Sequence, residues 1–545
     1  MSKHRFHRQL GLVNQNGVEN LKLCISGLDS VIIALLIQLE SMGAASKGGE
    51  IKLLKSKEEK LKETDHNWGA NLQNNEINWG QICNVFRDKG MKISCGSELN
   101  REFFHVNCSS PGKEIIDADL YATHWTCNAV ISKTQLRFNG SPTLSKSFID
   151  PSLQVSLAAS TTQLILRQMG LIRKEKILDQ WVTLTAQVDY NPDEALQIFN
   201  SKYGKPIVSE LENGLGSLLR FRMPLEDVCE SNFKEIIEHS CLKPLSLDEN
   251  WIMNIGPFNL DFDENNLLKI KDYQFPEFLE KGKILILGAG GLGSWAAPLI
   301  AQGIKPSGLE LNIIDSDLFV EPHNLNRQVL YSEENIGTPK APAAAKKIRE
   351  IIPGIKSING IVGKLEESHV STKIKNLPVE MGSLAEIIGV EQIIDDSQIF
   401  EALDNMDLAL ACLDNQFART LLNKKCIELD VPMINGGGES FDGIVEILKN
   451  GICMTCRYGK EAANEKEIIS CQEAGTRPVP SIVTTTAWVG SNQAILALLE
   501  LYSIQKEQLN QIGSDGFTWD SGKISSRHVS RLPWFDSKES CKCHV

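Results

Sequence analysis

The sequence lacks the features that would place this chain in a membrane, outside the cell or on nucleic acid. None of its apolar runs approaches the roughly 20 residues of a membrane-spanning helix. Its N-terminus, MSKHRFHRQL, has no apolar signal core, which is evidence against secretion. The formal net charge of -13 opposes non-specific binding to nucleic acid. We therefore expect a cytoplasmic protein that contacts neither membrane nor nucleic acid.

A regular cysteine framework is also missing. The 14 cysteines are scattered over 545 residues, and in a cytoplasmic protein such cysteines are more often metal ligands or nucleophiles than disulfide partners. The chain is too long for one ordinary domain, so two or three domains are expected. Its hydrophobic content of 42% is sufficient to give each domain a buried core.

What the chain does contain is a glycine-rich loop between a predicted strand, residues 284–287, and a predicted helix, residues 294–302. Glycines at G-x-G-x-x-G spacing let the backbone approach a phosphate closely, and the helix N-terminus favours the anion. Asp315 ends the next apolar run, where a carboxylate can accept a hydrogen bond from ribose hydroxyls. The pattern predicts a nucleotide site whose loop contains Gly288, Gly290, Gly291 and Gly293.

Four side chains that can bind a nucleotide follow Asp315, namely Asn324, Arg327, Gln328 and Lys340. The glycine loop alone fits an NAD-dependent oxidoreductase equally well. Hydride transfer has no need of a pair of cations at this place, whereas a triphosphate does. The two cations therefore favour ATP over NAD.

The string D-x-D-x-x-x-x-x-x-N-L-N-R-Q, followed by I-G-x-x-K, resembles the ThiF/MoeB and ubiquitin-activating enzyme family. Members use ATP and magnesium to adenylate the C-terminal carboxylate of a ubiquitin-like protein. The resemblance implies that Asp315 binds the ribose and that Arg327 and Lys340 neutralise the triphosphate. It also implies that Asn324 and Gln328 orient the triphosphate.

Two further features of this half resemble the family. Asp414, in the string A-C-L-D-N, stands at the position of a magnesium-binding aspartate of the family. An aspartate suits this role because a hard cation prefers carboxylate oxygen. The alternative is a helix cap for the segment that begins at Gln416. Residues 436–438 are three glycines that resemble a turn near the substrate tail, where a slender C-terminus can approach the backbone. A simple tight turn is the alternative there.

Residues 1–170 are predicted to be an inactive copy of the same fold. Ser26-Gly27-Leu28-Asp29 stands where the glycine loop belongs, and Lys55 replaces the acidic residue after the second strand. A nucleotide would lose its tight turn, its close approach and its ribose acceptor. Arg8, in the string H-R-F-H-R-Q-L, resembles the R-x-x-R-Q opening of the family. The resemblance implies that Arg8 reaches the ATP of the other half; the alternative is a solvated arginine near the terminus.

The expected fold is α/β, with two Rossmann-like ThiF-type domains in a pseudo-dimer. The inactive domain spans residues 1–170 and the active domain spans residues 276–545. Residues 171–275 carry no recognisable constellation and are interpreted as a connector or a small insert domain.

Four cysteines of the active half are candidate zinc ligands. Cys453 and Cys456 form C-x-x-C, and Cys541 and Cys543 lie at the C-terminus. The family often has such a site with two C-x-x-C pairs, which implies a structural Zn²⁺ that holds the C-terminal tail. The second pair here is C-x-C, so His544 is an alternative ligand. A redox role is the alternative for the first pair.

Cys471 lies in S-C-Q-E-A-G, which resembles the string around the family's thioester-forming cysteine. A thiolate on a loop can take an acyl group from an adenylate, and a buried cysteine that only fills the core is the alternative. The predicted function is ATP-dependent adenylation of a ubiquitin-like protein, followed by thioester transfer to Cys471. A conjugating enzyme that accepts the thioester is a further expected partner. The alternatives are peptide adenylation in peptide-antibiotic maturation and NAD-dependent oxidation.

Overall fold

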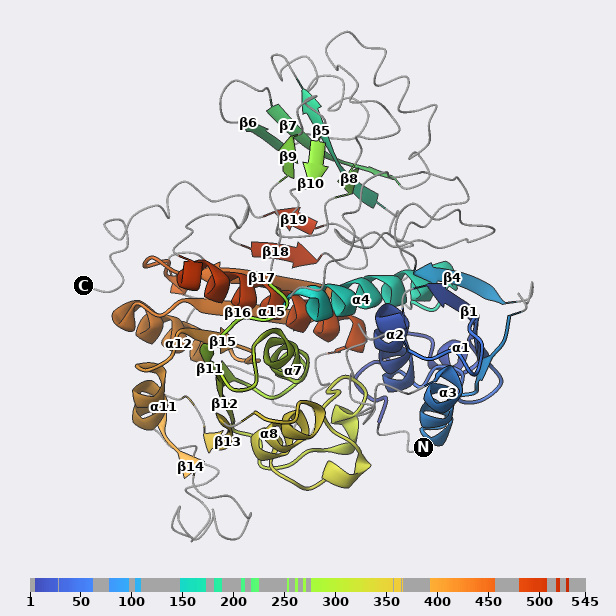
Figure 1. The fold of residues 1–545 in the computed structure, drawn as a ribbon, viewed down its shortest axis with the longest axis horizontal. Helices are drawn as coiled ribbons and strands as arrows, with labels where there is room; N and C mark the ends of the chain where they lie inside the picture. The colour runs from blue at the N-terminus through green and yellow to red at the C-terminus, as the bar shows by residue number, and fades with distance from the viewer. Residues whose placement is uncertain are drawn as a thin grey trace.

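The protein is described from a computed structural model (Figure 1). It describes residues 5–27, 29–61, 78–97, 103–108, 148–172, 181–188, 207–210, 217–224, 252–253, 260–262, 268–270, 276–355, 357–363, 365, 393–455, 480–506, 516–519 and 526–528.

The C-terminal half is built on a nine-stranded sheet. Its strands are β11 (Gly282–Leu287), β12 (Leu309–Asp315), β13 (Ser357–Gly363), β14 (Ile393–Ile394), β15 (Leu408–Ala411), β16 (Met433–Glu439), β17 (Asp442–Leu448), β18 (Gly516–Trp519) and β19 (Ser526–His528). The order is β14-β13-β12-β11-β15-β16-β17-β18-β19. Neighbours from β14 to β16 are parallel, and those from β16 to β19 are antiparallel. Because β12 and β15 flank β11 on opposite sides, the carboxyl end of β11 is a topological switch point, where open α/β sheets bind ligands.

Helices cover both faces of this sheet, which explains why β11 is apolar from Ile284 to Leu287. Successive side chains of a strand point to opposite faces. Ile284 and Ile286 therefore join one core cluster, whereas Leu285 and Leu287 join another. The helices and short 3₁₀ turns are α7 (Gly293–Gly303), η3 (Pro322–Asn324), η4 (Glu333–Asn335), α8 (Lys340–Ile351), α11 (Asp396–Leu403), α12 (Gln416–Leu429) and α15 (Val483–Lys506).

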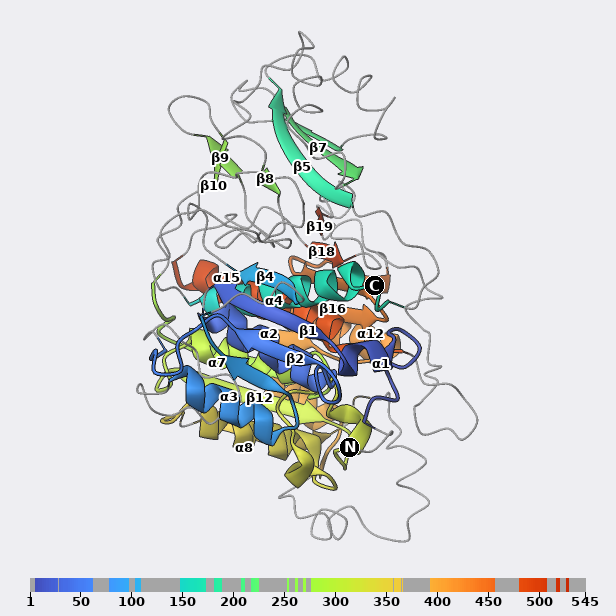
Figure 2. The same cartoon turned by 90° about the vertical axis from the view of Figure 1, so that its right-hand side faces the viewer.

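The N-terminal half contains a smaller sheet in which all strands are parallel. Its strands are β1 (Lys22–Gly27), β2 (Glu50–Leu53), β3 (Ile93–Cys95) and β4 (Phe104–Cys108), in the order β3-β2-β1-β4. Its helices are α1 (Gln15–Glu19), α2 (Asp29–Ser41), α3 (Trp79–Asp88) and α4 (Asp150–Gln168). Figure 2, turned to face this half, shows β1 and β2 side by side in front of the C-terminal elements.

Between the two halves in the sequence, the chain forms short antiparallel strands. They are β5 (Trp181–Val188), β6 (Ile207–Glu210), β7 (Ser217–Pro224) and β8 (Ile252–Met253), in the order β6-β7-β5-β8, and the pair β9 (Leu260–Phe262) and β10 (Leu268–Ile270). Among the described residues, no hydrogen bond joins these strands to the glycine loop at residues 288–293.

The two halves share one core. Helix α15 runs across the middle of the molecule beside α4 (Figure 1), and it also contacts α7 and α2. Two buried hydrogen bonds connect α15 to α4, from Thr484 Oγ1 to Gln163 Oε1 at 2.9 Å and from Asn492 Nδ2 to Ser156 Oγ at 3.0 Å. One hydrophobic cluster includes residues of both halves. A buried polar contact inside an apolar interface fixes its register, so these pairs hold the halves in one arrangement.

Two sequence expectations meet the structure differently here. The parallel α/β architecture is confirmed. The glycine turn at residues 436–438 is wrong, because these residues lie inside β16 and pair with β17. A Cβ on Gly436 would lie 2.2 Å from Gln493 Cδ of α15, so glycine at this position allows a strand and a helix to approach closely.

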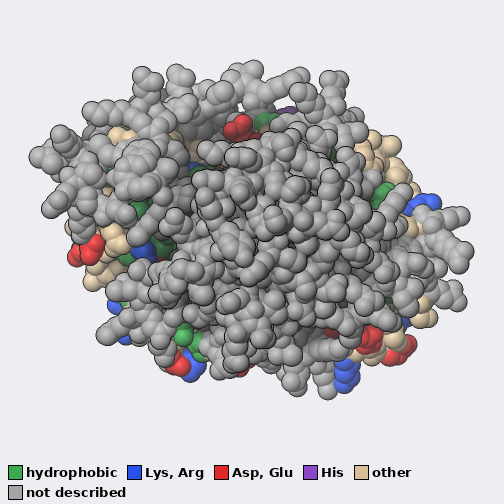
Figure 3. Space-filling view, turned by 90° about the horizontal axis from the view of Figure 1, so that it is seen from above, with side chains coloured by type: hydrophobic (Ala, Val, Ile, Leu, Met, Phe, Trp, Pro, Cys, Tyr) green, Lys and Arg blue, Asp and Glu red, His purple; other side chains and the backbone are tan. Residues whose placement is uncertain are grey.

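None of the described helices is long and apolar enough to cross a membrane. On the face seen in Figure 3, described acidic and basic side chains both show around the rim.

Candidate functional site

The glycine loop follows β11 and leads into α7. Gly288 has φ 99°, and a Cβ there would lie 2.4 Å from the carbonyl oxygen of Cys412. A Cβ on Gly293 would lie 1.9 Å from the carbonyl oxygen of Gly288, and one on Gly291 would lie 2.8 Å from Thr486 Cγ2. The fold therefore requires these three glycines. Among the described residues, a Cβ on Gly290 would meet only Gln328 Nε2 at 3.8 Å, so the space above Gly290 is open toward Gln328.

Asp315 holds this loop through its carboxylate. Its Oδ2 accepts from the Ala289 amide at 2.5 Å, and its Oδ1 accepts from the Asp317 amide at 2.7 Å. Burial raises the pKa of Asp315 to about 6, while the nearby charge of Lys340 opposes the rise. The predicted ribose acceptor is thus a half-buried carboxyl at the carboxyl end of β12, directly beside the glycine loop.

Lys340 is the first residue of α8 and is 5% exposed. Its ammonium forms an ion pair with Asp317. Tyr331 connects α8 to the loop, because its hydroxyl donates to the carbonyl of Ala289 at 2.7 Å and lies 3.2 Å from that of Lys340. Lys340 is therefore fixed at the edge of the site by groups on two neighbouring segments.

Arg327 and Gln328 approach the loop from the other side. Arg327 is 8% exposed, and its guanidinium donates to the carbonyl of His323 at 2.8 Å and to Asn326 Oδ1 at 3.0 Å. Gln328 is also buried, and its Oε1 has no hydrogen-bond partner among the described residues. A buried acceptor without a partner is costly, which is typical of a group that a ligand completes. Asn324 is used locally, since its Oδ1 accepts from the Glu321 amide at 2.8 Å.

Two residues of the N-terminal half, Arg8 and Gln9, form hydrogen bonds with the segments that surround Arg327. The carbonyl of Arg8 accepts from the Ser481 amide at 3.0 Å, next to the start of α15. Gln9 is fully buried, accepts from Asn326 Nδ2 at 3.4 Å and donates to the carbonyl of Met42 at 3.0 Å. A chain of hydrogen bonds therefore runs from the N-terminal core through Gln9 and Asn326 to Arg327.

Arg8 and Arg327 form one group of charges with Asp414. Burial, followed by the charge of Arg8, lowers the pKa of Arg327 to about 9, while Asp414 opposes the fall. Burial also lowers the pKa of Arg8, again opposed by Asp414. Two buried like charges are unfavourable side by side, so an anion bound between them would be strongly stabilised. The alternative of a solvated Arg8 is wrong, because its side chain is buried against the other half.

Comparison with known proteins identifies the family of the C-terminal half. Residues 264–532 match the model of the ThiF family. The C-terminal half is a ThiF-family domain.

Three curated relatives of this ThiF domain show how the names, sequence identities and covered lengths of its relatives vary. "Adenylyltransferase and sulfurtransferase UBA4" of Lodderomyces elongisporus is 31% identical over 36% of this chain and 36% of the relative. "Molybdopterin-synthase adenylyltransferase" of Haemophilus influenzae is 28% identical over 49% of this chain and 93% of the relative. "SAMP-activating enzyme E1" of Haloferax volcanii is 27% identical over 41% and 69%, respectively.

The chain spans 36–51% of the length of the first curated relatives that it matches. Among solved structures, that of Escherichia coli MccB with MccA-N7isoASN is similar at 19% identity and a TM-score of 0.33, over 47% of this chain and 67% of that one.

In the ThiF domain, Asp414 is exposed and precedes α12. The cap of α12 is Asn415, whose side chain accepts from the Ala418 amide at 3.2 Å, so the alternative helix-cap role belongs to the neighbour of Asp414. Within the described ranges, no group of three or more His, Cys, Asp or Glu could hold a metal ion. A magnesium ion on ATP needs only one or two protein carboxylates, because phosphates and water supply the other ligands. Asp414 beside Arg8 and Arg327 fits that requirement.

The cysteine predictions fall mostly beyond the described part of the chain. Cys453 is buried at 2% exposure. Cys456, Cys471, Cys541 and Cys543 lie outside the described residues. The zinc site and the thioester-forming cysteine therefore stay predictions.

Sequence reasoning missed several residues of the site. Gln9, Asn326, Asp317 and Tyr331 connect the predicted ligands to one another. Three of them stand inside the strings R-Q, D-x-D and N-L-N-R-Q, which was the available signal. Tyr331 carried no such signal, because its role depends on the fold of the segment between η3 and α8.

Proposed function

We propose that this protein uses ATP to adenylate the C-terminal carboxylate of a ubiquitin-like protein. In this reaction the carboxylate oxygen attacks the α-phosphate, a P–O bond forms, and pyrophosphate leaves with the broken bond's electrons. Relatives named as adenylyltransferases and as an E1 activating enzyme support the chemistry and the kind of acceptor.

One observation carries the proposal: Arg8 and Arg327, from opposite halves of the chain, are both buried and their charges interact, and Arg327 lies beside Gly291 of the glycine loop. Fixed cations at a developing negative charge are the largest single contribution in this kind of catalysis. Lys340 adds a third positive charge once the triphosphate competes with Asp317 for its ammonium. Asn324 and Gln328 would orient the phosphates, and Asp315 would accept from the ribose.

Asp414 would hold the Mg²⁺ of the bound ATP, which supplies further charge neutralisation at the phosphates. The N-terminal half, residues 1–170, is proposed to be an inactive Rossmann-like partner in a pseudo-dimer, and its contribution to the reaction is Arg8. Residues 171–275 are proposed to connect the two domains. Support comes from the parallel sheet of the N-terminal half and from its contact with the ThiF domain through α4 and α15.

The glycine loop provides the direct test of ATP binding. Gly290→Ala adds a methyl group where the protein itself has open space, so the variant should fold with an unchanged thermal midpoint. The methyl group would occupy the place of a phosphate, and we expect the Kd for ATP in titration calorimetry to rise by at least about tenfold, the loss of one charge-assisted hydrogen bond. Unchanged ATP affinity in a folded Gly290→Ala protein would remove the proposal.

Cys471 provides the test of the second step. Cys471→Ser should leave ATP–pyrophosphate exchange with a ubiquitin-like protein intact, because adenylation does not use the thiol. The same substitution should abolish an adduct of enzyme and ubiquitin-like protein that dithiothreitol releases. An adduct that persists in Cys471→Ser assigns the thioester to another cysteine, and exchange with a short peptide but no ubiquitin-like protein favours peptide adenylation.

A further inference from the structure

A second chemically distinct site lies in the N-terminal half, away from the residues proposed to bind ATP. Cys83 on α3 and Cys95 at the end of β3 bring their sulfur atoms to 2.6 Å. Neither residue forms part of a cysteine motif in the sequence, because 11 residues separate them. The fold alone creates the pair.

The local fold explains why the two sulfurs meet. Helix α3 buries one side, formed by Trp79, Ile82, Cys83 and Phe86, at the spacing of a helical face. Strand β3 pairs with β2 and places its last residue, Cys95, next to that face. The Cys95 thiol also lies 3.4 Å from the carbonyl of Trp79. Packing on both elements therefore holds the sulfurs in contact.

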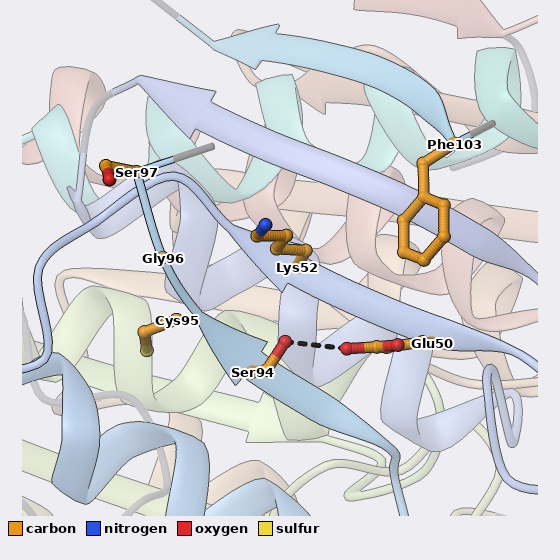
Figure 4. Close-up of a pocket in the computed structure, with 7 residues that line it drawn as sticks. All are labelled: Glu50, Lys52, Ser94, Cys95, Gly96, Ser97 and Phe103. Carbon is orange, nitrogen blue, oxygen red and sulfur yellow. Dashed lines mark hydrogen bonds between the residues drawn. The ribbon is translucent and has the colours of Figure 1, made fainter. Parts of the chain in front are cut away.

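Access to the two thiols is unequal. Cys83 is fully buried, whereas Cys95 is partly exposed and lines a pocket with Lys52, Ser94 and Phe103 (Figure 4). The hydrogen bond from Cys83 lowers the pKa of Cys95, and the same bond raises the pKa of Cys83. The charges of Arg87 and Lys57 favour the thiolate at both positions. Cys95 is thus the reachable, more nucleophilic thiol, and Cys83 is the partner behind it.

We propose that Cys83 and Cys95 form a dithiol–disulfide couple that exchanges with low-molecular-weight disulfides. The Cys95 thiolate attacks one sulfur of the small disulfide, forms a mixed disulfide and releases one small thiolate. Cys83 then loses its proton, attacks the Cys95 sulfur and releases the second small thiolate. One S–S bond is broken and one is formed, two electrons pass to the small disulfide, and the two protons end on the released thiols.

The resulting bond would connect α3 to β3 across a short loop, and such a loop closure restricts the unfolded chain. The oxidised protein should therefore have a higher thermal midpoint than the reduced protein. This inference does not depend on the proposed adenylation, since none of the ATP-site residues contributes to the pair.

The test uses the full chain with glutathione disulfide as the probe. The reduced protein is incubated with a series of glutathione disulfide concentrations, alkylated in acid-quenched samples and digested with trypsin. Cleavage after Arg87, Lys89 and Lys92 places the two cysteines on separate peptides. We expect a linked peptide pair, residues 63–87 with residues 93–101, that disappears after treatment with dithiothreitol.

Matched variants distinguish the two roles. Cys83→Ser should leave Cys95 as a mixed disulfide with glutathione, because nothing resolves it. Cys95→Ser should leave Cys83 as a free thiol. Cys426→Ser removes another buried cysteine and should leave the link unchanged. The proposal is overturned if the wild-type protein keeps both thiols free, or accumulates a glutathione adduct at Cys95 that Cys83 does not displace.

Discussion

The two halves of the chain share a glycine turn after their first strand, but the residue that follows the second strand is basic in one half and acidic in the other. Strand β1 ends at Gly27 with φ 119°, and β11 is followed by Gly288 with φ 99°, so each first strand leads into its helix through a left-handed glycine. After the second strand the halves differ. The ThiF domain has Asp315, which accepts from two amides, whereas the N-terminal half has Lys55, which forms an ion pair with Asp29 at 2.6 Å.

That difference fits the proposal that the N-terminal half is a copy of the fold that has no nucleotide site but keeps its sheet. Lys55 and Asp29 are 12% and 5% exposed, so this pair satisfies its own charges at the place where the other half has Asp315, the proposed ribose acceptor. A duplicated α/β unit needs its core and its glycine turn to fold, but it does not need the charges of the ligand site. What the N-terminal half contributes instead is Arg8, a buried cation whose charge acts on Arg327 of the other half.

The largest expected effect concerns Arg8, because it is the residue that the N-terminal half contributes to the proposed ATP site. Arg8→Ala removes a buried guanidinium beside Arg327, and we expect the Kd for ATP to rise by about 100-fold, the value of a strong charge-assisted contact. Arg5→Ala is the matched control, since Arg5 forms an ion pair with Glu40 within the N-terminal half. ATP titration calorimetry measures both variants. Equal ATP affinity for Arg8→Ala and Arg5→Ala would mean that the halves do not share a site.

The sequence was sufficient for the parts that depend on local pattern. Residues 284–287 and the glycine spacing predicted β11 and the turn into α7, because an apolar run and a G-x-G-x-x-G loop specify their own geometry. The glycine run at 436–438 was misread, because a turn and a strand under a close helix both require glycine. Only the position of Gln493 on α15 distinguishes them, and α15 lies far away in the sequence.

Contacts between distant segments were beyond the reach of sequence reasoning. The hydrogen bond between Gln9 and Asn326 joins residues 317 positions apart, and no spacing rule predicts it. The contact between Cys83 and Cys95 could not be predicted for the same reason, since a helix face and a strand end become neighbours only when the sheet is assembled. Sequence motifs therefore predict the residues that bind a ligand, whereas the residues that hold them in position depend on tertiary packing.

A smaller effect is expected from the pH dependence of ATP binding. The pKa of Asp315 is raised to about 6 by burial, so its carboxyl becomes mostly protonated as the pH falls below about 6. A neutral carboxyl is a weaker acceptor for ribose hydroxyls, and we expect ATP affinity to fall by about tenfold between pH 7.5 and pH 5.

The comparison with Asp315→Asn isolates this residue, because the phosphates of ATP titrate identically with both proteins. The variant should bind ATP more weakly at pH 7.5 and lose less affinity on acidification. Calorimetric titrations of both proteins at the two pH values measure the difference. Parallel losses of affinity in the two proteins would assign the pH dependence to groups other than Asp315.

The smallest expected effect on ATP binding comes from the corresponding position of the N-terminal half. Lys55→Met removes the ammonium that pairs with Asp29 and lies 5.5 Å from the centre of the Trp79 ring, and it leaves Asp29 buried without that cation. We expect the thermal midpoint to fall, since breaking a buried ion pair on one side costs about 3 kcal/mol. The double variant Lys55→Met/Asp29→Asn removes both charges and should recover part of that loss. Both variants should bind one ATP per chain with wild-type affinity, because the charges at Lys55 and Asp29 belong to the fold and not to a second nucleotide site. A second bound ATP in the wild-type protein, lost in Lys55→Met, would show that the N-terminal half has kept a function for its lysine.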